Sequence, residues 1–229
     1  MVDTFSSVSL VKAMAPLNTV LESFANEGGK VSSDADWLAE QARFASLVQS
    51  QRLDEGPSKR YLRNLVRAFV GRMESKSKVD LEDDDLMELV LWCALHNDTI
   101  PNADESSYQS FLVPSSDVTS SHPQEVRVRV FPMNNDVALK LWGAAACLAE
   151  YLVHHRDCWQ GKVFFETGAG TGFTSFVLAA CSHAKRVHMT DYSEASLQNM
   201  KHNVDINGRW LSKLETEISV VSGGSVLMK

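Results

Sequence analysis

The sequence predicts an α/β fold in its second half, preceded by a smaller unit made of helices. Two apolar, β-favouring runs, at 162–165 and 187–190, are separated by a glycine-rich turn and a segment with helical spacing. That order is typical of a strand, a turn, a helix and a second strand, the βαβ unit of a parallel sheet. Residues 35–97 instead carry apolar positions at helical spacing, so we expect an all-helical unit there.

Length, charge and cysteine usage limit the class of protein. The chain has 229 residues, 44% of them hydrophobic, which is enough for one or two domains with a substantial core. Its formal net charge of −7 argues against a general nucleic-acid binder. Cys93, Cys147, Cys158 and Cys181 lack the paired spacing of a zinc site or disulfide framework, so we expect reduced, buried thiols. With neither a basic leader nor a membrane-length apolar run, a cytoplasmic location is expected.

Residues 1–100 are expected to form a helical N-terminal region. One helix covers Trp37 to Val48, with Asp34 or Asp36 as its cap, and another starts near Asp84. Between them, Ser58 begins a helix with two distinct faces. Its apolar stripe is Leu62, Leu65, Val66 and Phe69, and its basic face is Arg60, Arg63 and Arg67. This basic face could meet an acidic partner such as a ribosome-bound factor or RNA, although a solvated helix face is the commoner explanation.

Residues 101–124 are polar and rich in Ser-Ser pairs, which predicts a linker that packs in places. The alternation of polar and apolar residues in 125–131 then predicts a half-buried strand, at a sheet edge or in a hairpin, with its arginines facing water. Next, a cap among 134–136 begins a helix that runs to about His155. Its predicted core positions are Leu141, Ala145, Leu148 and Leu152, with Trp142 beside them.

The glycine-rich turn follows the first predicted strand of the βαβ unit. Its pattern is acidic-x-G-x-G-x-G, starting at Glu166, whereas the dinucleotide fingerprint would need a glycine where the chain has Phe173. Alternating glycines let a chain turn sharply and bring its backbone against a ligand. Asp191 ends the second strand about 20 residues beyond the turn, where an acid can hold ribose hydroxyls. A tight turn without a ligand is the alternative interpretation.

The rest of the chain continues the same alternation of helix and strand. A helix capped at Tyr192-Ser193 is expected to end at Asn207-Gly208, and 218–221 can form a third strand. His154, His155 and Cys158 suggest a metal site at first sight. Adjacent histidines on a helix point in different directions, however, so no metal is expected.

The acidic-x-G-x-G-x-G pattern resembles the first motif of S-adenosylmethionine-dependent methyltransferases. A wider stretch of the chain is similar to the eukaryotic elongation factor 2 lysine methyltransferases, part of the seven-strand protein-lysine methyltransferase superfamily. The similar segments, in chain order, are SKRYLRNLVRAF, SYQSFLVPSS, LKLWGAAACLAEYL, ETGAGTG and TDYSEASLQNMKHNVDING.

The resemblance implies a Rossmann-like methyltransferase sheet over 125–229, with S-adenosyl-L-methionine as cofactor and elongation factor 2 as the protein substrate. Apart from the resemblance, the acidic net charge and the lack of a membrane-length apolar run lead us to expect no membrane partner and no direct nucleic-acid binding. No catalytic residue is named, because transfer of a methyl group to a lysine amine needs no covalent nucleophile. Cofactor contacts are expected from the tryptophan of the approach helix, the acid and backbone of the glycine turn, and the acid of the second strand: Trp142, Glu166, Gly168, Ala169, Gly170 and Asp191.

Two family motifs are not found after the third predicted strand. These are an acid-tryptophan pair near the adenine and an Asp-centred motif beside the target lysine. From Gly161 onward the sequence has room for about three strands, so we expect an incomplete sheet, the N-terminal half of the catalytic domain. The alternative function is a non-catalytic interaction protein in which this half is vestigial.

Overall fold

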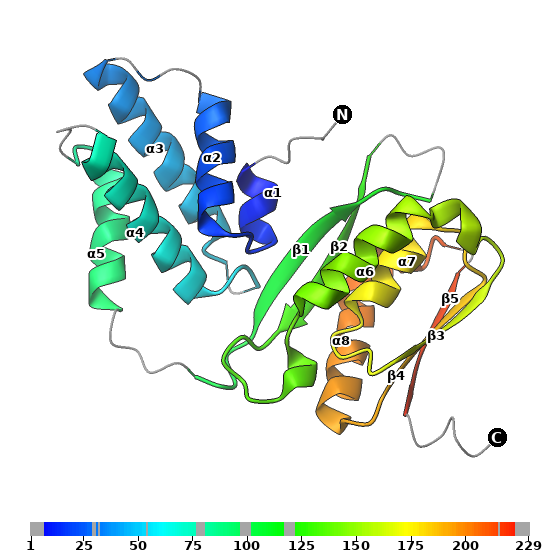
Figure 1. Ribbon diagram of the computed structural model, residues 1–229. Helices are drawn as coiled ribbons and strands as arrows, with labels where there is room; N and C mark the ends of the chain where they lie inside the picture. The colour runs from blue at the N-terminus through cyan, green and yellow to red at the C-terminus, as the bar shows by residue number, and fades with distance from the viewer. Residues whose placement is uncertain are drawn as a thin grey trace. The chain divides into compact units, whose positions relative to one another are not determined.

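The computed structural model describes residues 7–28, 31, 33–53, 55–76, 81–96, 102–116, 122–214 and 216–222. The chain divides into two compact units, Met1–Pro101 and Asn102–Lys229 (Figure 1). The first unit is made of helices among its described residues, and the second contains the strands.

The helical unit contains α1 (Ser7–Lys12), α2 (Leu17–Gly28), α3 (Asp34–Gln51), α4 (Lys59–Lys76) and α5 (Asp84–Leu95). Its core is aromatic at the centre: the rings of Phe44 and Phe69 stack with centroids 3.8 Å apart, and Phe24 meets both edge-on. All four residues of the stripe predicted for α4 are buried, so that amphipathic assignment is confirmed. The N-cap of α3 is Ser33 rather than Asp34 or Asp36, and Asp36 completes a capping box with it.

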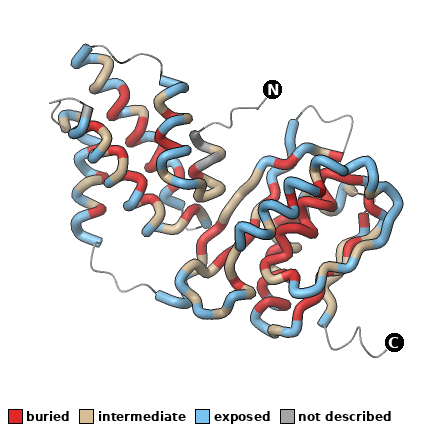
Figure 2. Tube along the Cα trace, in the orientation of Figure 1, coloured by how far each residue is buried: buried red, intermediate tan, exposed pale blue. Residues whose placement is uncertain are grey.

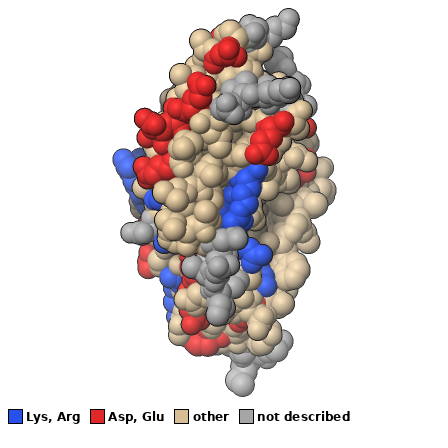
Figure 3. Space-filling model, turned by 90° about the vertical axis from the view of Figure 1, so that its left-hand side faces the viewer, with Lys and Arg blue, Asp and Glu red and all other residues tan. Residues whose placement is uncertain are grey.

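Two of the three arginines on the basic face of α4 contact α5. The Arg63 guanidinium lies 5.7 Å from the ring centroid of Trp92, and Arg67 donates to the carbonyl oxygen of Cys93 at 3.5 Å. Acidic and basic side chains share the face shown in Figure 3, with acidic ones gathered toward its upper part. These contacts favour a helix face engaged within its own unit over a binding surface for an acidic partner.

The second unit begins with a hairpin of β1 (Ser107–Val113) and β2 (Gln124–Val130), which pair antiparallel. The strand β2 is as expected, but β1 lies in the segment expected to be a linker. The polar residues of β1 obscure the strand pattern in the sequence. Ser107, for example, is as buried as its neighbour Tyr108 although it is polar. The β2 arginines do not simply face water: Arg127 lies over the Tyr108 ring, and Arg129 Nε donates to Asn199 Oδ1 at 2.8 Å.

The prediction of a single helix from about residue 135 to 155 is wrong. It is broken into a 3-10 turn, η1 (Val137–Leu139), and the helix α6 (Gly143–His154), with η2 (Arg156–Trp159) after it. Asp136 caps η1 through the Ala138 N–H, and the chain is extended at Trp142, which becomes the N-cap of α6. The predicted core face of this helix is also only partly right, because Leu152 is buried whereas Leu148 is 46% exposed.

A parallel sheet of β3 (Val163–Thr167), β4 (Arg186–Asp191) and β5 (Glu217–Ser222) follows, in the order β3-β4-β5. The helices α7 (Phe173–Cys181) and α8 (Glu194–Leu211) connect these strands and lie on one face of the sheet (Figure 1). All nine residues of α7 are buried, because it packs against α6, the hairpin and β4 (Figure 2). The βαβ prediction is confirmed, and the described residues contribute three strands to this sheet.

Two smaller expectations fail. The helix α8 does not end at Asn207-Gly208 but continues to Leu211, and Asn207 lies within it with its side chain bonded to β2. Of the four cysteines, Cys93 and Cys181 are buried, but Cys147 and Cys158 are exposed. None of the helices in the described part of the chain is both long enough and apolar enough to cross a membrane.

Candidate cofactor site

A cavity of about 440 Å³ opens beside the glycine turn, at the carboxyl ends of β3 and β4. Ligands of open α/β sheets bind at this end of the strands, and the volume lies within the range of about 300–1,000 Å³ usual for small-molecule sites. The structure places all six sequence-predicted contact residues on its lining: Trp142, Glu166, Gly168, Ala169, Gly170 and Asp191.

The three glycines of the turn all have left-handed backbone angles, with φ of 67° at Gly168, 55° at Gly170 and 78° at Gly172. They are needed for different reasons. A Cβ on Gly168 would meet no atom within 4 Å, so that position faces open space in the cavity. A Cβ on Gly170 would lie 3.0 Å from the carbonyl oxygen of Ala138, and one on Gly172 would lie 2.8 Å from Met189 Sδ. Gly168 therefore keeps the cavity open, while the other two allow close packing.

Asp191 is 4% exposed and holds the turn in place. Its Oδ2 accepts from the Gly170 N–H at 3.0 Å, and its Oδ1 accepts from Tyr192 at 2.8 Å and Ser193 at 3.0 Å. A carboxylate offers about four acceptor positions, so about one remains, on Oδ2. The residue can thus bind one hydroxyl of a ribose in this arrangement, whereas the sequence suggested both.

Glu166 lines the cavity from the end of β3 and also caps α7. Its Oε2 accepts from both the backbone N–H and the hydroxyl of Ser175, which supplies the cap that Gly172, the N-cap residue of α7, has no side chain to provide. The positive end of the helix dipole favours a carboxylate in this position. Burial nevertheless raises the pKa of Glu166 above its ordinary value of 4.5, although the bonds from Ser175 and Thr174 act in the opposite direction.

Trp142 lines the cavity from the start of α6 and is 54% exposed. Its indole N–H donates to the carbonyl oxygen of Val137 at 2.8 Å, which fixes the ring against η1. This exposure shows that Trp142 is not part of the buried core. An aromatic face that is anchored but accessible can stack on a planar ligand group.

Sequence reasoning missed several other residues that line the cavity. Ala138 and Lys140 come from the η1 segment, Leu148 comes from α6, and Tyr192 follows Asp191 with 90% of its surface exposed. No local pattern marks Ala138 or Lys140, because the sequence predicted a regular helix over both. Tyr192 could have been found, since it directly follows the acid that ends β4.

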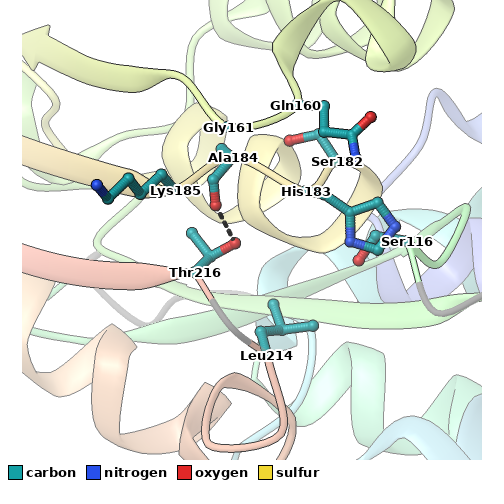
Figure 4. A pocket seen from close by; sticks show the side chains of 9 residues that line it. All are labelled: Ser116, Gln160, Gly161, Ser182, His183, Ala184, Lys185, Leu214 and Thr216. Atoms are coloured by element: carbon teal, nitrogen blue, oxygen red, sulfur yellow. Dashed lines mark hydrogen bonds between the residues drawn. The ribbon is translucent and has the colours of Figure 1, made fainter.

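A second cavity of about 510 Å³ lies at the amino ends of the same strands (Figure 4). Ser116, Gly161, His183 and Lys185 are among its lining residues, and Thr216 Oγ1 donates to the Ala184 carbonyl oxygen at 2.6 Å. This end of a parallel sheet is not where α/β proteins bind their ligands, so the cavity beside the glycine turn is the better candidate.

The residues that first suggested a metal site face elsewhere. His154 and His155 donate through Nδ1 to carbonyl oxygens one turn earlier, those of Glu150 and Tyr151. Within the described ranges, no three His, Cys, Asp or Glu side chains gather closely enough to hold a metal ion.

Comparison with known proteins shows a family resemblance in the same part of the chain. Residues 124–222, from β2 to the end of β5, match the family model described as lysine methyltransferase. Methyltransferase-like protein 22 of Mus musculus is 34% identical over 94 residues, 41% of this chain and 21% of that protein. The protein N-terminal and lysine N-methyltransferase efm7 of Schizosaccharomyces pombe is 33% identical over 98 residues, 42% of this chain and 38% of that protein.

These matches confirm the resemblance of residues 124–222 to protein-lysine methyltransferases. The matched stretch contains β2, the glycine turn and Asp191, and it includes all of the residues that line the cavity. The chain spans 21–38% of the length of these two relatives.

Proposed function

We propose that this chain, whose residues 124–222 match the lysine methyltransferase family, binds S-adenosyl-L-methionine beside the glycine turn and acts in methylating a lysine of a protein. One observation carries the proposal: six residues selected from the sequence for cofactor contact line a single cavity. They come from three separate parts of the chain: the η1–α6 junction, the end of β3 with the turn after it, and the end of β4.

The residues present fit the chemistry of this cofactor. Gly168 leaves space for an amino acid moiety to approach the turn backbone, and Asp191 retains an acceptor for a ribose hydroxyl. The Trp142 ring offers an apolar face, and Glu166 offers a negative charge near a cofactor that carries a sulfonium and an ammonium group. When bound, the cofactor supplies an activated methyl group for a neutral lysine amine. The chain's own residues bind and orient it and exclude water.

We further propose elongation factor 2 as the protein substrate. This proposal is supported by two segments, one in each unit, that are similar to the elongation factor 2 lysine methyltransferases. SKRYLRNLVRAF lies on α4 in the helical unit, whereas SYQSFLVPSS contains β1, in the hairpin that packs on α7 and α8. Neither segment lies within residues 124–222, so these two segments extend the resemblance beyond the stretch that the family model matches.

Two measurements on the full chain test these proposals separately. Calorimetric titration with S-adenosylmethionine tests the site, and labelled methyl transfer to elongation factor 2 tests the substrate. Binding with transfer supports both. Binding without transfer favours a cofactor-binding protein that has another substrate or is not catalytic, and absence of binding to the folded chain refutes the proposed site.

Cofactor binding should weaken as the pH falls through the raised pKa of Glu166. Above that pKa the carboxylate attracts the cationic cofactor, and protonation removes this attraction. Burial places the transition above the ordinary value of 4.5. Glu166→Gln keeps an acceptor for Ser175 but cannot ionise, so its affinity should be lower at neutral pH and nearly flat from pH 4.5 to 8. Equal pH dependence of the dissociation constant in both proteins would contradict this role of Glu166.

A further inference from the structure

The buried face of α8 carries a row of polar side chains. Ser196, Asn199, Asn203 and Asn207 are spaced three or four residues apart, which puts them on one side of the helix. None is more than 1% exposed. Burying an amide or hydroxyl group costs free energy unless the group is hydrogen-bonded. The hydrogen-bond partners of these four side chains therefore show which parts of the protein the row stabilises.

Two of the asparagines bind only the hairpin and their own helix. Asn207 Oδ1 accepts from the Arg127 N–H at 3.0 Å, and its Nδ2 donates to the Arg127 carbonyl oxygen at 2.6 Å. Asn199 Nδ2 donates to the Arg129 carbonyl oxygen at 3.1 Å. These amides bind the main chain of β2 along the side that faces α8, where a neighbouring strand would otherwise pair. We call Asn199 and Asn207 the strand pair.

The other two residues reach the glycine turn. Ser196 Oγ donates to the Gly170 carbonyl oxygen at 2.8 Å, and Asn203 Nδ2 donates to the Thr171 carbonyl oxygen at 2.9 Å. Asn203 also accepts from the Arg129 N–H at 2.8 Å, so it joins the turn to β2. We call Ser196 and Asn203 the turn pair.

Both residues of the turn pair donate hydrogen bonds to peptide groups of residues that line the candidate cofactor cavity. Gly170 and Thr171 are both on its lining. Gly170 is held at two points, since Asp191 accepts from its N–H while Ser196 donates to its carbonyl oxygen. The glycines of this turn can adopt many backbone conformations, and these bonds select one of them.

We propose that Ser196 and Asn203 are positioning residues for the cofactor: they orient the backbone of the glycine turn toward S-adenosylmethionine without touching it. The inference rests on the proposed function. It adds residues that lie outside the glycine motif and contribute through the preorganisation of the turn.

Four single alanine variants of the full chain, at Ser196, Asn199, Asn203 and Asn207, test the proposal. All four lose buried hydrogen bonds and should melt at lower temperature than the parent. Ser196→Ala and Asn203→Ala should each bind S-adenosylmethionine about three- to tenfold more weakly by calorimetry. The strand-pair variants should keep the affinity of the parent despite their lower stability.

The variants are compared at a temperature where each is folded by circular dichroism. Ser196→Ala removes only a single hydroxyl group. If Asn203→Ala does not fold, the affinity of Ser196→Ala alone tests the proposal. Parent-like affinity in Ser196→Ala, or an equal loss in Asn207→Ala, would overturn the inference while leaving the proposed function intact. A folded parent that does not bind S-adenosylmethionine overturns the proposed function, and this inference with it.

Discussion

Replacing Gly168 with valine is expected to weaken S-adenosylmethionine binding by about a hundredfold or more, equivalent to about 2.7 kcal/mol. A Cβ at this position points into open space within the cavity, with no protein atom within 4 Å. The valine side chain would therefore occupy the volume that we assign to the ligand. The left-handed φ of 67° adds backbone strain of about 1–2 kcal/mol. Calorimetric titration of the folded variant measures the loss.

Gly161 provides a matched control for this strain. Its φ is 70°, and a Cβ there would also meet no atom within 4 Å, but it lies at the other end of β3, in the second cavity. Gly161→Val should therefore lose similar stability and keep its affinity. Gly170→Val is a less specific test, because its Cβ would press on the Ala138 carbonyl oxygen. Parent-like affinity in Gly168→Val would exclude this cavity as the cofactor site.

Replacing Asp191 with alanine should cost about 3 kcal/mol or more in the free energy of unfolding. Three backbone N–H groups, those of Gly170, Tyr192 and Ser193, would lose a charged acceptor. The melting temperature should fall by about 6–12 °C. Affinity for S-adenosylmethionine should fall at least tenfold, since both the ribose acceptor and the geometry of the turn are lost. Thermal denaturation and calorimetry of the same preparation give both quantities.

Asp191→Asn separates the two effects. Its side-chain carbonyl can still accept from Tyr192 and Ser193, whereas its amide group cannot accept from Gly170. The loss of stability should be smaller than in the alanine variant, while the loss of affinity should be similar. An asparagine variant that binds like the parent would show that Asp191 supports the turn without contacting the ribose.

Much of the α/β unit could be predicted from the sequence because its signals are local. The glycine turn, the helix after it and the acid at the end of the next strand lie within one short segment, 161–191. Their spacing reflects backbone geometry and helix period, which neighbouring residues largely determine. The amphipathic stripe of α4 was predictable for the same reason.

Prediction failed where a residue's partner is distant in the sequence. The strand β1 is not apparent in its own residues, since its pairing with β2 and its packing on α7 stabilise it. The break between η1 and α6 has a similar origin. Phe131 donates to the Leu139 carbonyl oxygen and Trp142 to that of Val137, so tertiary contacts and a cap at Asp136 override a helical pattern.

The sequence by itself therefore determined the βαβ unit, its glycine turn and the identity of six residues that line one cavity. Only the tertiary structure decided what those residues bind within the protein. Asp191 uses most of its acceptors on the turn, and Glu166 caps a helix. The polar row of α8 was equally invisible in the sequence. An asparagine on a helix is usually solvated, and burial against a distant strand and turn is what makes Asn203 part of the site.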